Sequence, residues 1–69
     1  MRFSDVEVGM EFYDEMNDCK VVIDEISVDS KTFACDVYDD FLYNNSEDLT
    51  PRYELHTLME LNRYQLMED

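Results

Sequence analysis

Groups that carry out nucleophilic chemistry are scarce in this 69-residue chain. His56 is its only histidine, and Cys19 and Cys35 are its only cysteines. Nucleophilic catalysis needs a serine or cysteine beside a base that a carboxylate orients, and no Gly-x-Ser-x-Gly or Cys–His signature is present. We therefore expect no enzymatic activity. His56 is predicted to have a local structural role at the end of a strand, and the two cysteines to be reduced, buried thiols.

The pattern of oxygen and sulfur ligands also argues against a metal or cofactor. The cysteines form no Cys-x-x-Cys pair, so a zinc site would need carboxylates to complete it. Aspartates at positions 36, 39 and 40, or acids at 47 and 48, are oxygen ligands of the kind that calcium and magnesium prefer, but no EF-hand pattern accompanies them. A chain with one glycine cannot form a glycine-rich phosphate loop. We expect no cofactor and no metal.

The carboxylates themselves are the unusual feature. The chain has 18 acidic and 5 basic side chains, which gives a formal net charge of −13. Two long stretches, residues 3–19 and 32–51, contain acids and no Lys or Arg. A small domain needs a net charge of only about 2–8 for solubility, so this excess calls for an explanation.

One explanation is that the carboxylates imitate phosphates. Residues two apart on a strand place their side chains about 6.6 Å apart on one face, which is comparable to the spacing of phosphates along one nucleic-acid strand. Asp36 and Asp40 are predicted to flank Tyr38 on such a face, where the ring offers a surface for arginine. The predicted partner-binding residues are Asp14, Glu15, Asp18, Asp36, Tyr38, Asp39, Asp40, Glu47 and Asp48. The alternative, that the acids serve only solubility, stays open at this point.

The charge also excludes several partners. DNA, RNA and anionic lipid surfaces repel such a protein, so we expect neither direct nucleic-acid binding nor membrane binding. The attractive partner is a basic nucleic-acid-binding protein. Residues 1–10 carry acids and no apolar stretch, which predicts no secretory signal and a cytoplasmic location.

These side chains must be positioned by short strands in a single domain. Hydrophobic residues make up 45% of the chain, enough for one small core. Alternation and β-branched residues predict strands over 11–15, 19–28, 32–38, 52–56 and 63–67. A phase change at Asp24-Glu25 predicts a bulge, and Gly9 is expected to supply a positive φ in a turn.

The last third of the sequence has two interpretations. One amphipathic helix could begin at Thr50 and Pro51. The favoured division is a strand with Tyr53 and Leu55 facing inward, a helical turn that a Thr57–Glu60 capping box begins, and a closing strand. Together these elements predict an all-β fold, a small antiparallel barrel of five to six strands with one short helical turn. Exposed edge strands are compatible with a homodimer.

The segments Val8-Gly9-Met10-Glu11-Phe12, Val21–Val28 and Thr57-Leu58-Met59-Glu60 resemble those of SH3-like barrels, which implies the fold and transfers no functional residue. In charge, size and absence of catalytic residues, the sequence is similar to phage-encoded DNA-mimic inhibitors of the anti-CRISPR and anti-restriction type. That resemblance implies a stoichiometric inhibitor that occupies the basic nucleic-acid channel of a host effector, such as a CRISPR or restriction protein.

A second hypothesis comes from a different class of function. The chain could be a small interaction or phage accessory module with mainly apolar contacts, because a barrel this small cannot bury every aromatic residue. The contact surface would then comprise Tyr13, Tyr38, Phe41, Leu42 and Tyr43. Binding that is insensitive to salt would favour this hypothesis over phosphate mimicry.

Overall fold

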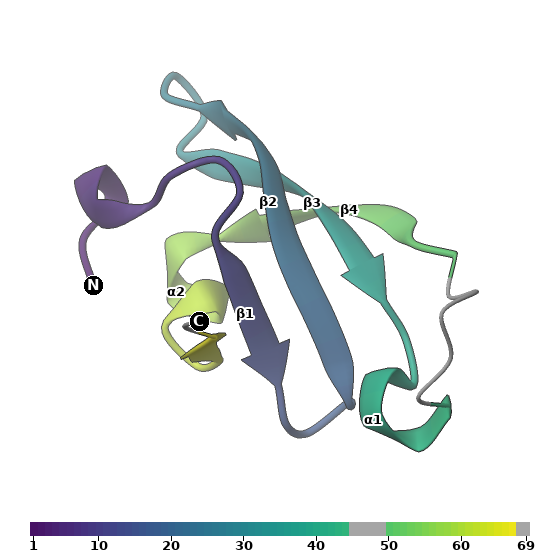
Figure 1. Ribbon diagram of the computed structural model, residues 1–69. Coiled ribbons are helices and arrows are strands. Elements are labelled where there is room, and N and C mark those ends of the chain that lie inside the picture. Colours follow the sequence, from purple (N-terminus) through teal and green to yellow (C-terminus); the bar gives the residue numbers. More distant parts are fainter. Residues whose placement is uncertain (45–49, 68–69) are drawn as a thin grey trace.

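The computed structural model describes residues 1–44 and 50–67, which form one antiparallel sheet with short helical segments (Figure 1). The strands lie in the order β4-β3-β2-β1-β5. Their bounds are β1 Glu11–Asp14, β2 Cys19–Ser27, β3 Thr32–Tyr38, β4 Arg52–Thr57 and β5 Gln65–Met67. The helical segments are η1 Phe3–Asp5, α1 Phe41–Asn44 and α2 Leu58–Leu61. No helix of this described part is long and apolar enough to cross a membrane.

The predicted all-β class and most of the predicted strand positions are confirmed. The register of β2 against β3 shifts between Ile23 and Glu25, which is the predicted bulge. Gly9 has φ +96°, a conformation that a residue without Cβ adopts at little cost. The strand–turn–strand division of residues 52–67 is also confirmed, since α2 begins at a Thr57–Glu60 capping box between two strands.

One face of the sheet carries the core, and we call it the inner face. Phe12, Val21, Ile23, Phe33 and Val37 are almost completely buried there. The N-terminal segment and α2 cover these side chains through Val6 and Leu61, with Phe3, Met10, Leu58 and Tyr64 packed around them. The opposite face, which we call the outer face, carries α1 at one corner.

Closure of the sheet into a barrel was predicted wrongly. Within the described residues, β4 pairs only with β3 and β5 pairs only with β1, so β4 and β5 are the two edges of an open sheet. β5 is three residues long and pairs along its whole length with β1. The bulge in β2 bends the sheet without bringing its edges together.

The predicted orientation of β4 was also wrong. Tyr53 and Leu55 were expected to face inward, but they are 64% and 60% exposed. The register pairs Tyr53 with Asp36 and Leu55 with Ala34, all on the outer face. The inward position is taken by His56, which is 3% exposed and lies opposite Phe33.

Candidate protein-binding surface

Five of the predicted acidic residues lie at one end of the sheet. Asp14 is the last residue of β1, and the turn to β2 carries Glu15 and Asp18. The end of β3 lies beside this turn because Lys20 pairs with Tyr38. Asp39 and Asp40 follow Tyr38 directly. Figure 1 shows this end of the sheet, with α1 next to the β1–β2 turn. We call these five residues the acidic end.

Asp14 is a structural member of the acidic end. It is 8% exposed and faces inward. Its carboxylate accepts hydrogen bonds from the Met16 amide at 3.2 Å and from Asn17 Nδ2 at 2.8 Å. An aspartate at this position bonds the backbone that follows it and so shapes the turn. The carboxylate of Asp14 is thus directed into the protein.

Asp18 joins the β1–β2 turn to α1. Its carboxylate accepts hydrogen bonds from the amides of Leu42 and Tyr43, both at 3.0 Å, and from the Tyr13 hydroxyl at 2.8 Å. These bonds, led by that of the Leu42 amide, lower the pKa of Asp18. Its φ of +51° suits aspartate, which tolerates left-handed backbone better than most residues. Asp18 therefore organises the acidic end as well as adding charge to it.

Asp39 is paired within the protein. Arg52 Nε donates to its Oδ2 at 2.7 Å, and the Cys19 thiol donates to its Oδ1 at 3.2 Å. The Arg52 guanidinium is the main reason that the pKa of Asp39 is lowered. This pair connects the end of β3 to the start of β4.

Glu15 and Asp40 are the members of the acidic end whose carboxylates are most available to contact a partner. Both residues are exposed. The predicted position of Asp40 was wrong in detail: β3 ends at Tyr38, and Asp40 lies in a turn with φ +53°, so it does not share the strand face of Asp36 and Tyr38. Glu47 and Asp48 lie outside the described residues.

Asp36 and Tyr38 lie on the outer face, beside residues that were not predicted to contact a partner. Asp36 is opposite Tyr53, and Ala34 is opposite Leu55. A shallow hollow of about 270 Å³ is lined by Tyr53 and Leu55 of β4, Ala34 of β3 and Glu25 of β2, and it extends towards the β2–β3 turn. The alternation of Tyr53 and Leu55 with polar neighbours signalled that they share a face, but did not indicate which face.

His56 lies between two carboxylates. Its Nε2 lies 3.0 Å from Glu54 Oε1 without forming a hydrogen bond. Its Nδ1 lies 3.1 Å from Glu60 Oε2 and 3.3 Å from the Tyr64 hydroxyl. These contacts join β4, α2 and the segment before β5. The predicted role of His56 at a strand end is consistent with this position.

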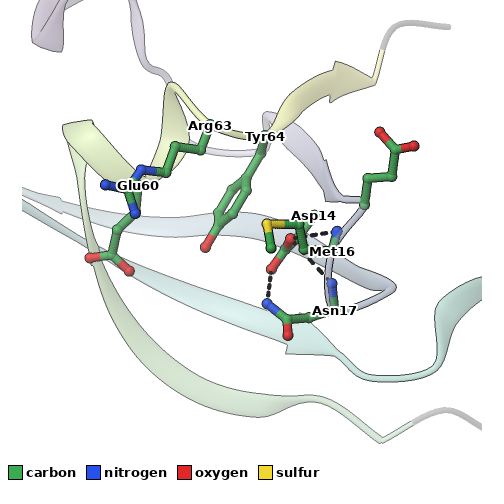
Figure 2. A pocket seen from close by; sticks show the side chains of 7 residues that line it. Asp14, Met16, Asn17, Glu60, Arg63 and Tyr64 are labelled. Atoms are coloured by element: carbon green, nitrogen blue, oxygen red, sulfur yellow. Dashed lines mark hydrogen bonds between the residues drawn. The ribbon is translucent and has the colours of Figure 1, made fainter.

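A groove of about 410 Å³ separates the β1–β2 turn from the segment between α2 and β5 (Figure 2). The Tyr64 ring lies between the Glu60–Arg63 side and the Asp14–Asn17 side. The residues that line the groove supply carboxylates, a guanidinium and a phenol, and they include no serine, cysteine or histidine. Within the described residues, no group of three or more His, Cys, Asp or Glu side chains is arranged to hold a metal ion.

Comparison with known proteins adds no relative. No family model, no curated protein and no solved structure matches the chain.

Proposed function

We propose that this protein binds a basic surface of a nucleic-acid-binding protein and blocks it by presenting carboxylates in place of phosphates. The observation that carries this proposal is the excess of exposed carboxylates over available cations. Eight acidic side chains in the described part are exposed: Asp5, Glu7, Glu15, Asp24, Glu25, Asp29, Asp39 and Asp40.

Two of the five cations are already engaged by carboxylates of the same chain. Lys20 Nζ lies 2.8 Å from Glu11 Oε1, and Arg52 Nε lies 2.7 Å from Asp39 Oδ2. The surface field is therefore strongly negative, and such a field attracts basic partners and increases the rate of their association. Because this protein would occupy the partner's nucleic-acid-binding surface, one molecule would inhibit one partner molecule, and inhibition would be stoichiometric.

A second candidate function has structural support of its own. Tyr43 is 85% exposed and Leu42 is 63% exposed, and both belong to the predicted apolar contact surface. Tyr53 and Leu55 add exposed apolar area on the outer face. An interaction module that binds through these residues would tolerate high salt, whereas charge-mediated binding would not.

Affinity capture in steps of rising salt separates the two functions. The tagged protein is incubated with nuclease-treated extract from its own cellular source, and each salt fraction is identified. We expect a nucleic-acid-binding protein that leaves at moderate salt and that added nucleic acid displaces. A partner that stays bound at high salt and ignores nucleic acid would contradict the proposal and support the apolar module.

A charge-reversal pair then tests the surface itself. Glu15→Lys with Asp36→Lys should weaken the captured complex about tenfold, since two ion pairs of about 0.7 kcal/mol each correspond to that factor. The matched control is Asp5→Lys with Glu7→Lys, which changes the net charge equally on the N-terminal segment that covers the inner face. Equal weakening by both pairs would show a response to net charge alone, with no defined surface.

A further inference from the structure

We infer that the outer face, at Asp36 and Tyr53, binds arginine side chains of the partner in preference to lysine. This inference rests on the proposed function, because it takes from that proposal that the partner is basic. It adds a defined contact and a side-chain specificity that net charge alone does not supply.

The geometry at this position combines a carboxylate with aromatic rings. Asp36 is opposite Tyr53 across the β3–β4 pairing, and Tyr38 is two residues further along the same face of β3. Directly opposed residues in a sheet have Cβ atoms about 4.5–5.5 Å apart, so the Asp36 carboxylate and the Tyr53 ring lie within reach of one guanidinium. Tyr53 is 64% exposed, which leaves its ring available for stacking.

The outer face already holds one cation in this way. Lys20 Nζ lies 2.8 Å from Glu11 Oε1, 5.9 Å from the centre of the Tyr38 ring and 5.4 Å from that of the Phe41 ring. The same face therefore binds an ammonium group between a carboxylate and aromatic rings. Cation–π contacts of this kind act within about 6 Å of a ring centre.

The position at Asp36 and Tyr53 has the same components without an internal cation. No Lys or Arg of the described residues forms an ion pair with Asp36 or Glu25. Glu25 borders the hollow on its side away from Tyr53 and supplies a second carboxylate. The aliphatic part of a long side chain can lie over Ala34 and Leu55, while its charged end reaches one of the carboxylates.

Arginine fits this arrangement better than lysine. Its planar guanidinium stacks on aromatic rings and donates two parallel hydrogen bonds to a carboxylate, whereas the lysine ammonium is compact and more strongly hydrated. A second copy of the chain is the wrong occupant, because two chains with a net charge of −13 each repel one another.

Two peptides of equal length and charge test the inference: an Arg-Gly repeat and a Lys-Gly repeat. Each is titrated into isotope-labelled full-length protein, and amide chemical shifts report both affinity and location. We expect the arginine peptide to bind about 2- to 5-fold more tightly, with the largest shifts on β3 and β4. Equal affinities, shifts confined to the acidic end, or no binding of either peptide would overturn the inference.

Matched variants separate stacking from charge. Tyr53→Leu should abolish the preference for arginine, while Asp36→Asn should weaken both peptides. The control Tyr43→Leu removes an 85% exposed ring on α1, outside the β3–β4 pairing, and should leave the preference unchanged. A preference that survives Tyr53→Leu would refute the inference. Equal, salt-sensitive binding of both peptides would refute it and leave the proposed function intact. The proposed function fails if salt-step capture yields no basic partner, or a partner that stays bound at high salt and ignores nucleic acid.

Discussion

The Tyr13 hydroxyl donates a hydrogen bond to Asp18 Oδ1 at 2.8 Å, and this contact closes the β1–β2 hairpin at the acidic end. The same Asp18 carboxylate accepts the amides of Leu42 and Tyr43. A side chain from β1 and the start of α1 therefore meet on one carboxylate. Because this carboxylate is bound within the protein, it contributes charge to the surface without being free to pair with a partner.

The contact predicts an unusual titration of Tyr13. The hydrogen bond to Asp18, followed by desolvation and the nearby carboxylates, raises the pKa of Tyr13 to about 12. The unfolded value is about 10, so the folded state holds the phenolic proton more tightly. This contribution to stability is complete below pH 10 and is lost as the pH rises through 12.

Nuclear magnetic resonance of the tyrosine rings checks this titration. The step near pH 12 should disappear in Tyr13→Phe, and Asp18→Asn should move the pKa of Tyr13 back towards its ordinary value. Asn keeps the left-handed backbone that position 18 requires, but it replaces one of the two accepting oxygens by an NH2 donor, so the change removes the charge together with part of the hydrogen bonding. A Tyr13 ring that titrates near pH 10 in the folded protein would show that the bond to Asp18 is absent in solution.

Thr57→Ala should destabilise the protein by about 1 kcal/mol, the usual contribution of a side chain that caps a helix. Thr57 Oγ1 accepts the Glu60 amide at 3.4 Å, and Glu60 Oε1 accepts the Thr57 amide at 3.1 Å. In a domain of this size, the change lowers the thermal midpoint by about 4–8 °C. Ser4→Ala, at an exposed position in η1, is the control, and a loss of the same size there would contradict a specific capping effect.

Leu61→Ala should cost about 2–5 kcal/mol, because it opens a cavity where α2 covers the inner face. Leu61 is 1% exposed, whereas Met59 on the same helical turn is 69% exposed. Met59→Ala should therefore change stability by less than about 0.5 kcal/mol. Urea unfolding of both variants gives the comparison. Similar costs at the two positions would mean that α2 does not pack as the structure describes.

Both cysteines should resist thiol reagents in the folded protein. Burial is the main reason that the pKa values of Cys19 and Cys35 are raised to about 11, so little thiolate forms at neutral pH. A coloured disulfide reagent should react slowly under native conditions and rapidly in urea. Rapid reaction of either thiol before unfolding would show that its side chain reaches solvent.

The regular elements were predictable because their signals are local. Strands β2 and β3 follow from β-branched residues and from the alternation of Phe33, Cys35 and Val37 on one face with Ala34, Asp36 and Tyr38 on the other. The Thr57–Glu60 capping box likewise depends on residues three apart. The bulge was visible as a phase change at positions 24 and 25.

The roles of individual carboxylates were less predictable, because they depend on contacts between distant segments. Asp39 is bound by Arg52, thirteen residues later, and Asp18 is bound by amides of α1. Asp14 looks like its neighbour Glu15 in the sequence, yet it is buried while Glu15 is exposed. The sequence gives the number and order of the carboxylates, but it does not show which of them are buried or bonded to other groups of the same protein.

By itself, the sequence determined an acidic, all-β chain, its strand positions and the phase change in β2, since composition and two-residue periodicity are properties of neighbouring residues. The tertiary structure alone decided that the sheet stays open and that Tyr53 and Leu55 face outward. Alternation defines two faces of a strand without indicating which one meets the core. That choice depends on the register of β4 against β3, where His56 enters the interior between Glu54 and Glu60.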